Sequence, residues 1–587
     1  MKWQGPFIIT QQFDKCHFLI RMGDVTRKFH VNMLKPYNEP GPEHLTPAHQ
    51  PYQSEDTIID SHKEEADMDQ HLTIGTALAI EDDSSNAAAS RDPTIPTGQQ
   101  EAYGDCNLAP DLTAEQRLSM LNLLQNYQDL LTDIPNVTNV LEHHIDLIHD
   151  KPIKHSYPLP YSLHKQLKDD LQKWKNLGIV EQSTSPYCSP LLAVRKKDGT
   201  HRFCLDCRQL NRITKPDLEP IADPNEIFQK LTNASYLSKL DLTSGFWQVP
   251  LGEKSRPYTA FTTNFGHYQF RTMPFGLVGA PACFSRLMRE VLKGLDFLDA
   301  FMDDIIVFSA SFEDHLMHLE ELFKRLKNAR LHVKPSKCLL GFQSLEYLGH
   351  IVGHGSCSPM EDKVAAIRET PFPSTLKELL SFLGSLGYYQ RFIKSYAELT
   401  APLTNLLRGR SGDNSRLTWN ESAIAAFHKL REALTCHPVL QLPDLSLPFT
   451  LRTDASENGV GAVLCQPSQH DSRILCPVFY ASKKFRDAQT RYSTVEKEAY
   501  AIFWAVQKFE RYLYGRCFTI ETDHQPLLYL QSADRLNPRI KRWAIYLSFF
   551  RFFVKHIEGK DNNLADYMSR IPHEVDLCES TFIGGKV

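Results

Sequence analysis

The chain has 587 residues, 42% of them apolar and 23% charged, and its formal net charge is −5. This length is enough for about three or four domains with cores of their own. There is no signal peptide and no apolar run near about 18 residues, which argues against the secreted and membrane-spanning classes and predicts a soluble protein of a reducing compartment.

Short apolar runs separated by turn residues fill residues 1–37 and predict a small β-barrel-like module. Residues 38–110 are rich in Pro, Ser, Asp, Glu and Gln and carry acidic runs such as Glu81-Asp82-Asp83. Low hydrophobicity with local negative charge predicts a disordered linker. Because no candidate catalytic residue lies in these two segments, we expect residues 1–110 to be dispensable for catalysis.

An ordered region is predicted from Leu112 onward, where Thr113 and Gln116 have the spacing of a capping box ahead of a helical apolar pattern. Farther on, residues 191–203 indicate two strands joined by an Asp-Gly turn. Basic residues gather near the tip of this hairpin, among them Lys196 and Arg202. A cationic tip suits a triphosphate, although charge alone favours a solvated basic turn.

Asp241 ends an apolar strand and is followed by a Gly-containing turn and Phe246.

Farther along, Gly276, Gly279 and Ala280 open a predicted helix. These small residues would allow a ligand to pack closely against backbone. They could equally punctuate a loop.

Two adjacent carboxylates, Asp303 and Asp304, lie between apolar residues on both sides. Residues 305–308 are β-branched or aromatic and residues 295–301 offer a partner strand, so we expect the pair at the turn of a buried hairpin. Carboxylates held this close resist joint ionisation unless cations neutralise them. A lone Asp-Asp pair is more often a solvated turn, but a third carboxylate in a similar setting, Asp241, favours two metal ions and in-line nucleotidyl transfer.

A second set of carboxylates occupies the C-terminal part of the chain. Asp454 lies on an apolar strand, a helix carries Glu496 and Glu498, another strand ends at Asp523, and Asp566 falls on a short predicted helix. Four carboxylates from two strands and two helices can ligate a pair of Mg²⁺ ions and cut a phosphodiester with activated water. Residues two apart on a helix point about 200° away from each other, so only one of the two glutamates can face the metals.

These ordered motifs resemble the reverse transcriptase and ribonuclease H segment of a Gypsy-type long-terminal-repeat retrotransposon Pol polyprotein, over residues 112–570. The resemblance implies a multidomain fold of the α+β and α/β classes. It comprises a right-hand polymerase with fingers, palm and thumb, a connection region, a ribonuclease H-like domain and the small N-terminal β module. The Gly-Pro-Phe and His-Val-Asn-Met-Leu-Lys-Pro-Tyr pieces of residues 1–37 resemble the tail of a Gypsy-type integrase, but we do not expect integration because no integrase core is found.

The implied domains follow the chain in order. They are residues 1–37, the integrase C-terminal-like module; 38–110, the acidic disordered linker; 111–357, the reverse transcriptase fingers, palm and primer grip; 358–445, the thumb and connection region; 446–572, the ribonuclease H-like domain; and 573–587, the tail.

The resemblance also implies roles for single residues. The matched catalytic and metal-binding acids are Asp241, Asp303, Asp304, Asp454, Glu498, Asp523 and Asp566. The matched nucleotide-binding residues are Lys196, Arg202, Phe246, Phe275 and Gly276, and the matched primer and template residues are Lys337, Tyr347, Leu348 and Gly349. Phe246 would lie under the sugar and collide with a 2′-hydroxyl, while Phe275 stands where retroviral enzymes often have Gln. Glu498 is favoured over Glu496 because the family's apolar-small-apolar helix run follows it directly.

The function implied is an RNA- and DNA-directed DNA polymerase with ribonuclease H activity, using two Mg²⁺ ions at each site, with Mn²⁺ as an alternative. The expected partners are an RNA template, a DNA primer, an RNA·DNA hybrid and deoxynucleoside triphosphates, without a membrane and with the oligomeric state open. We expect a cytoplasmic retroelement particle, with the nucleus as the alternative location. The competing hypothesis is an inactive or domesticated fragment that binds nucleic acid or protein; the presence of every matched acid favours retained chemistry.

Overall fold

The structure is a computed structural model that describes residues 8–12, 17–22, 25–30, 101–195, 199, 201–407, 417–434, 439–468, 471, 473–523 and 538–557. The chain divides into two compact units, Met1–Leu72 and Thr73–Val587. In the first unit, β1 (Ile8–Gln12), β2 (His17–Met22) and β3 (Val25–His30) form an antiparallel sheet. The strands expected in residues 1–37 are therefore present.

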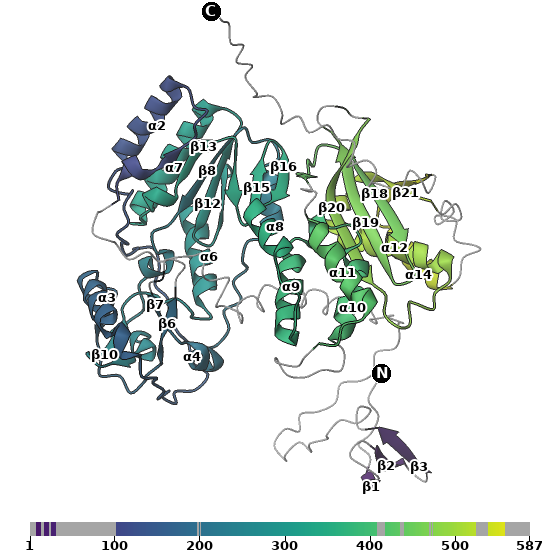
Figure 1. The fold of residues 1–587 in the computed structure, drawn as a ribbon, viewed down its shortest axis with the longest axis horizontal. Helices are drawn as coiled ribbons and strands as arrows, with labels where there is room; N and C mark the ends of the chain where they lie inside the picture. The colour runs from purple at the N-terminus through teal and green to yellow at the C-terminus, as the bar shows by residue number, and fades with distance from the viewer. Residues whose placement is uncertain are drawn as a thin grey trace, which may run out of the picture. The chain divides into compact units, whose positions relative to one another are not determined.

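A five-stranded sheet, called here the central sheet, forms the core of the first half of the second unit, in the order β11-β12-β8-β13-β4. Its strands are β4 (Asn107–Leu108), β8 (Tyr236–Asp241), β11 (Leu298–Phe301), β12 (Asp304–Ser309) and β13 (Leu339–Phe342). The helices α6 (Ala280–Val291) and α7 (Phe312–Asn328) pack on it, as Figure 1 shows.

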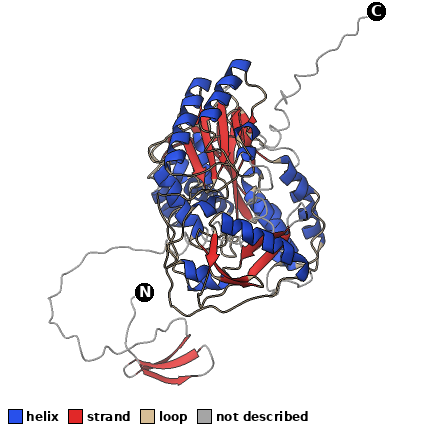
Figure 2. Cartoon of the chain, turned by 90° about the vertical axis from the view of Figure 1, so that its left-hand side faces the viewer, coloured by secondary structure: helices blue, strands red, loops and turns tan. Residues whose placement is uncertain are grey.

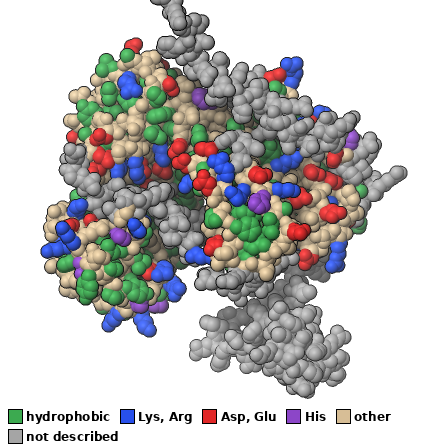
Figure 3. All heavy atoms as spheres, viewed as in Figure 1, with side chains coloured by type: hydrophobic (Ala, Val, Ile, Leu, Met, Phe, Trp, Pro, Cys, Tyr) green, Lys and Arg blue, Asp and Glu red, His purple; other side chains and the backbone are tan. Residues whose placement is uncertain are grey.

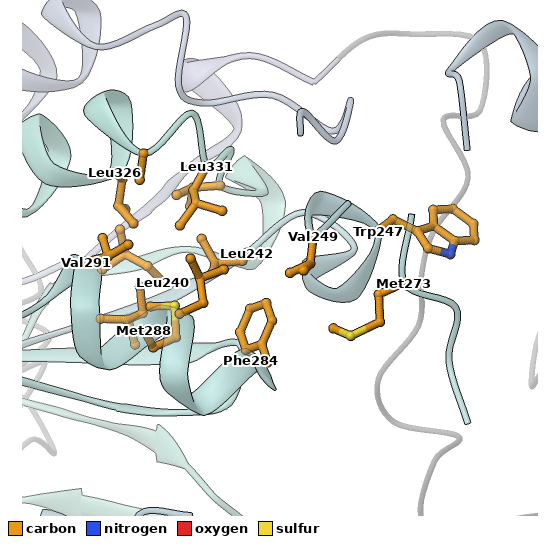
Figure 4. Packing of buried hydrophobic residues seen from close by; sticks show 14 of the residues in the cluster. Leu240, Leu242, Trp247, Val249, Met273, Phe284, Met288, Val291, Leu326 and Leu331 are labelled. Carbon is orange, nitrogen blue, oxygen red and sulfur yellow. The ribbon is translucent and has the colours of Figure 1, made fainter. Parts of the chain in front are cut away.

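Alternation along β8 explains how this packing exposes a carboxylate. Leu240 and the following Leu242 are buried with Phe284 and Met288 of α6, as Figure 4 shows. Because successive side chains on a strand point to opposite faces, Asp241 between them faces away from this core. Burying the two leucines therefore fixes the direction of the acid.

The expected linker of residues 38–110 is wrong at its C-terminal end. Its residues 101–110 are ordered: η3 (Tyr103–Asp105) is followed by β4, which pairs in parallel with β13. The amides of Asn107 and Ala109 donate to the carbonyls of Cys338 and Leu340, and Ala109 is buried. A two-residue strand carries no periodicity, and its partner lies far along the chain, so composition alone gave no sign of it. Residues 31–100 lie outside the described part.

A smaller region surrounds the predicted basic hairpin. It contains α3 (His164–Asn176), β5 (Val180–Gln182), β6 (Leu191–Arg195), β7 (His201–Leu205), α4 (Arg208–Ile213), β9 (Phe261–Thr263) and β10 (Gly266–Phe270). Two further helices lie elsewhere: α2 (Ala114–Asn126) contacts α7, and α5 (Pro224–Lys230) packs into a hydrophobic cluster with Tyr347 and Leu379. The predicted capping box of Thr113 and Gln116 is present at α2. The predicted hairpin is present as the antiparallel pair of β6 and β7.

Between the two halves of the second unit, a four-stranded sheet and four helices follow. The sheet has the order β14-β15-β16-β17, with β14 (Ser344–Tyr347), β15 (His350–Gly353), β16 (Ser356–Pro359) and β17 (Leu440–Gln441). The helices are α8 (Glu361–Arg368), α9 (Leu376–Tyr388), α10 (Tyr396–Leu406) and α11 (Glu421–Glu432). The expected boundary between residues 357 and 358 lies inside β16.

The C-terminal sheet has the order β20-β19-β18-β21-β22. Its elements are β18 (Phe449–Ala455), β19 (Gly459–Pro467), β20 (Leu475–Lys484), α12 (Thr494–Lys508), α13 (Glu510–Leu513), β21 (Cys517–Thr522), α14 (Pro538–Leu547) and β22 (Arg551–His556). The strand that bears Asp454, β18, is the central strand of this sheet. Figure 2 shows the strands of the second unit flanked by helices, and no helix in the described residues is long and apolar enough to cross a bilayer.

Candidate active sites

The adjacent carboxylates Asp303 and Asp304 lie at a hairpin turn, as the sequence predicts. β11 and β12 pair antiparallel, and Asp304 is in register with Asp241 on the neighbouring β8. Met302, inside the turn, has a φ of 55°, a left-handed conformation that costs a non-glycine residue free energy. The fold thus brings all three predicted acids of the first set to one end of the central sheet.

Backbone contacts hold this turn in place. The amide of Leu242 donates to the carbonyl of Asp303 at 3.2 Å, and the hydroxyl of Tyr347 donates to the carbonyl of Asp304 at 3.3 Å. Gly245 packs so closely that an added Cβ would lie 3.1 Å from the Cβ of Asp303. Sequence reasoning did not single out Gly245; its place in the turn after Asp241 was the available signal.

Two lysines pair with two of the three carboxylates of the first site. The Nζ of Lys337 lies 3.2 Å from Oδ2 of Asp241, and the Nζ of Lys239 lies 3.5 Å from Oδ1 of Asp304. Burial raises the pKa of Asp241 to about 6; Lys337 opposes this shift, while Asp303 and Asp304 add to it. Lys337 was expected beside a primer or template phosphate, and Lys239 was missed although it lies on the same face of β8 as Asp241.

Aromatic residues predicted to bind nucleotide surround the same turn. The ring of Phe246 lies 5.2 Å from that of Phe275 and 5.5 Å from that of Phe284, and Phe246 is half-buried. Gly276 has a φ of 97°, which favours glycine, and its carbonyl accepts from Nδ2 of Asn211 at 2.8 Å. Asn211, which sequence reasoning missed, also accepts from the amide of Val278 through Oδ1.

The predicted basic finger is described only in part. Arg202 on β7 lines a small pocket together with Phe275 and Trp247, so it belongs to the neighbourhood of the first site. Lys196 at the hairpin tip lies outside the described residues, and so does Asp566 of the second set.

The second site forms where β18 and β21 run parallel as neighbours in the C-terminal sheet. Asp454 lies near the end of β18 and Asp523 directly follows β21, and Glu498 approaches them from α12. Glu498 is buried and accepts a hydrogen bond from the amide of Ala455, but its Oε2 is buried without a hydrogen-bond partner. Burial, then the charges of Asp454 and Asp523, raise the pKa of Glu498 to about 8.

Glu496 is occupied elsewhere. Its carboxylate closes a capping box with Ser493 at the start of α12 and lies 2.7 Å from Nη1 of Arg539. These hydrogen bonds, first among them the one from the backbone of Ser493, lower the pKa of Glu496. The geometry therefore directs Glu498, and not Glu496, toward the other acids.

The cations near the second site are also committed to another acid. Glu521 is buried and pairs with Arg452 at 2.7 Å and with Lys555 at 3.1 Å. Among the described residues, no lysine or arginine pairs with Asp454, Glu498 or Asp523. A proton on Glu498 therefore neutralises negative charge in the second site, as lysines do in the first site.

Both sites offer ligands that suit a hard divalent cation. Within the described ranges, no group of three or more His, Cys, Asp or Glu side chains is arranged as a ready-made metal site. In the first site the lysines hold the carboxylate oxygens that a cation would use. In the second, the unpartnered Oε2 of Glu498 beside two further carboxylates is an acceptor that a cation would satisfy. The donor chemistry of both sites therefore fits a hard divalent cation.

Comparison with known proteins matches both regions to described families. Residues 194–352 match the family "Reverse transcriptase (RNA-dependent DNA polymerase)", and residues 444–550 match the "RNase H-like domain found in reverse transcriptase". The chain is 38% identical over 464 residues to the retrovirus-related Pol polyprotein from transposon 297 of Drosophila melanogaster, covering 78% of this chain and 43% of the relative. It is 35% identical over 444 residues to that from transposon gypsy of the same species, covering 73% of this chain and 42% of the relative.

Solved structures support the fold. A foamy viral protease-reverse transcriptase in complex with double-stranded DNA matches with a TM-score of 0.69 and 22% identity, covering 76% of this chain and 79% of that one. A second structure of that protein, with an RNA/DNA hybrid, matches with a TM-score of 0.64 and 21% identity, covering 81% and 64%. This confirms the expected multidomain fold.

The curated relatives are longer than the chain, which spans less than half of their length. The two domain matches fall in the order in which the two acid sets occur, and each match contains acids of its own set. Over about three quarters of its length the chain is similar to the Pol polyproteins of Gypsy-type retrotransposons, and it contains a region that matches reverse transcriptases followed by a region that matches the ribonuclease H-like domain found in them.

Proposed function

We propose that the chain is an RNA- and DNA-directed DNA polymerase with ribonuclease H activity, which copies retrotransposon RNA into DNA and degrades the RNA of the hybrid. One observation carries the proposal: two separate sets of carboxylates meet, each at the end of adjacent strands, within the two domains whose families carry these activities. Two-metal phosphoryl chemistry needs such a set at each site.

At the polymerase site, Asp241, Asp303 and Asp304 are the proposed ligands of two Mg²⁺ ions. Bound there, the ions would supply activation of the primer hydroxyl and charge neutralisation of the triphosphate. Lys337 lies within 3.3 Å of both carboxylate oxygens of Asp241, so its amine would compete with a bound cation for these oxygens. The left-handed turn at Met302 and the close contact with Gly245 keep the two adjacent acids oriented.

At the ribonuclease H site, Asp454, Glu498 and Asp523 are the proposed ligands, with Asp566 as the fourth by sequence match. The orphaned Oε2 of Glu498 supports this assignment. Glu498 holds a proton near neutral pH in the metal-free protein, because its pKa is raised to about 8. That proton must leave before the carboxylate can act as a ligand.

Phe246 is proposed to exclude ribonucleotides. Its ring is wedged between Phe275 and Phe284 next to the turn of Asp303, a position suited to meeting the sugar of an incoming nucleotide. Replacing Phe246 by alanine should raise the incorporation of ribonucleotides relative to deoxynucleotides in a competition assay. Unchanged selectivity would make the ring part of the core only.

Nucleic acids are the proposed partners. On the face drawn in Figure 3, blue Lys and Arg side chains gather at the lower left, over the region that Figure 1 labels α3, β10 and α4. Exposed basic residues of these helices are Lys165, Lys168, Lys173, Arg208 and Arg212. Such a patch can bind phosphate backbone even though the chain's net charge is −5. The foamy viral structures with double-stranded DNA and with an RNA/DNA hybrid support the same class of partner.

Primer extension tests the proposal directly. The purified chain, with Mg²⁺, should extend a DNA primer on RNA and DNA templates with deoxynucleoside triphosphates and shorten the RNA of a labelled hybrid. A folded chain that binds hybrid but performs neither reaction would favour the competing hypothesis of an inactive or domesticated binding module.

Two further proposals concern the N-terminal module and the location. The three-stranded sheet of residues 8–30 supports a compact β module, and its integrase-tail character rests on the sequence pieces alone. Location in a cytoplasmic retroelement particle is likewise proposed from the family. Fractionation of cells that express the chain, with antibody detection in particles and nuclei, tests the location.

A further inference from the structure

A pair of adjacent tyrosines grips the turn between β14 and β15. Leu348 and Gly349 form this turn, with φ values of 45° and 71°. The hydroxyl of Tyr388, the last residue of α9, donates to the carbonyl of Leu348 at 2.5 Å. The hydroxyl of Tyr389 donates to the carbonyl of Gly349 at 2.8 Å. Two neighbouring carbonyls are therefore held by two neighbouring side chains from another element.

The rings of the two tyrosines also close over the turn. An added Cβ on Gly349 would lie 3.3 Å from Cε1 of Tyr388 and 3.4 Å from the hydroxyl oxygen of Tyr389. Any side chain at this glycine would push the rings outward and lengthen both hydrogen bonds. The absence of a side chain is thus needed for the grip, in addition to the positive φ.

His350 completes the grip from inside the core. It is buried, its Nδ1 lies 2.7 Å from the carbonyl of Leu348, and its ring lies 5.3 Å from that of Tyr388 and 5.5 Å from that of Tyr389. A carbonyl only accepts, so Nδ1 carries the hydrogen. Burial lowers the pKa of His350 to about 4, which keeps the ring neutral and this hydrogen-bond pattern fixed near neutral pH.

Tyr347 connects this turn to the polymerase acids. Tyr347, directly before the turn, is fully buried, and its hydroxyl donates to the carbonyl of Asp304. A displacement of the turn would therefore be transmitted along β14 to the backbone of a proposed metal ligand. This turn matches the primer grip by sequence resemblance, which implies no role for the two tyrosines.

We propose that Tyr388 and Tyr389 are positioning residues for polymerisation, holding the Leu348–Gly349 turn, and through it the primer end, in register with Asp303 and Asp304. The inference rests on the proposed polymerase function. Both hydroxyls donate to carbonyls of the turn, so in this proposal they act on the reaction through the turn. Because correct placement of the reacting atoms governs the chemical step, loss of the hydroxyls should lower kcat more than it raises KM.

The test uses the full chain with Tyr388→Phe, Tyr389→Phe and the double substitution. These changes remove the hydroxyls and keep the rings that the core packs against. The matched control is Tyr396→Phe, which removes a hydroxyl that donates to the carbonyl of Leu383 at 3.3 Å in the same helical region, away from the turn. Steady-state extension on an RNA template, cleavage of a preformed hybrid, Tm and amide hydrogen exchange at residues 348–350 are measured on each protein.

For the double variant we expect kcat for extension to fall about tenfold, with KM for the nucleotide within about twofold, and exchange at residues 348–350 to be about tenfold faster. Hybrid cleavage and Tm should match those of Tyr396→Phe. Equal extension by the double variant and the control would overturn the proposal. Parallel loss of extension, cleavage and Tm would also overturn it, because that pattern indicates a structural role.

The experiment separates this inference from the proposed function. If the unaltered chain fails to extend primers, the proposed polymerase function fails. The exchange measurement then still decides whether the two hydroxyls hold the turn: unchanged exchange in the double variant overturns the grip, and faster exchange confined to residues 348–350 supports it.

Discussion

The two carboxylate sites of this chain neutralise their negative charge in different ways. At the polymerase site, Lys337 and Lys239 lie against Asp241 and Asp304. At the ribonuclease H site, the nearby Arg452 and Lys555 pair with Glu521, and burial leaves Glu498 with a pKa raised to about 8. One metal-free site is thus balanced by lysines and the other by a proton.

This difference has a consequence for pH. A proton on a ligand competes with the metal, so metal binding weakens as pH falls below the pKa of that ligand. The pKa is raised to about 6 for Asp241 and to about 8 for Glu498. Hybrid cleavage should therefore lose activity at a higher pH than primer extension does.

The same shift affects folding in the absence of metal. Glu498 has a folded pKa above its usual value of 4.5, so it favours the folded state below about pH 4.5 and this contribution is lost as pH rises toward about 8. Metal binding reverses the loss by replacing the proton. A Tm that falls between pH 5 and 8 without Mg²⁺, and falls less with it, is the expected result.

The largest effect expected is that of Asp303→Asn. Extension should fall by about a hundredfold or more, because a proposed metal ligand is lost with almost no change of shape. Cleavage of a preformed hybrid should stay unchanged, since its ligands lie in another domain. Asp299→Asn on the same hairpin, where Asp299 pairs with Lys230, is the matched control. Near-normal extension by the Asp303 variant would remove this residue from the site.

The converse change is Glu498→Gln, which should abolish hybrid cleavage and spare extension. Glu496→Gln serves as its control on the same helix, because Glu496 is committed to Ser493 and Arg539. That variant should retain cleavage within about threefold, with a Tm loss that reflects about 1 kcal/mol of weakened capping. Loss of cleavage in the Glu496 variant alone would show that the helix face has been assigned wrongly.

Two N-terminal truncations test whether β4 and Glu101 stabilise the segment that carries Lys337. Removing residues 1–100 should leave both activities intact. Removing residues 1–110, which the sequence alone predicted to be dispensable, also deletes β4 and Glu101, whose carboxylate accepts from the amide of Ser336 next to Lys337. The structure therefore restricts the dispensable part to residues 1–100. Since each lost hydrogen bond costs about 1 kcal/mol, the longer deletion should lower Tm by several degrees and reduce extension more than cleavage. Equal Tm values for the two truncations would show that β4 contributes nothing.

A smaller effect is expected from Lys337→Met. Lys337 lowers the pKa of Asp241, so its removal leaves burial and the neighbouring acids to raise that pKa further above about 6. The acid limb of extension should move to higher pH, with cleavage unmoved. Lys230→Met, which removes the pair with Asp299, should leave both profiles unchanged. A shift toward lower pH would mean that Lys337 does not neutralise Asp241.

Local sequence patterns predicted the elements that carry the acids. The apolar flanks of Asp303 and Asp304 predicted the hairpin, and the capping residues predicted α2, because these signals act over a few residues. Contacts between distant segments left no such signal. Three such contacts join residues far apart in sequence: Lys337 with Asp241, β4 with β13, and the two tyrosines with the Leu348–Gly349 turn. The choice of Glu498 over Glu496 rested on family resemblance, and the physical reason, the ion pair of Glu496 with Arg539, is visible only in the structure.

The most direct test of the contrast between the sites is the pH dependence of both activities on one preparation at limiting Mg²⁺. Primer extension on an RNA template and cleavage of a preformed hybrid are followed from pH 5.5 to 9. Primer extension should keep its activity down to about pH 6, whereas hybrid cleavage should lose activity below about pH 8. The difference between these two pH values should become smaller as the Mg²⁺ concentration is raised. Acid limbs that coincide, or extension failing at the higher pH, would contradict the account.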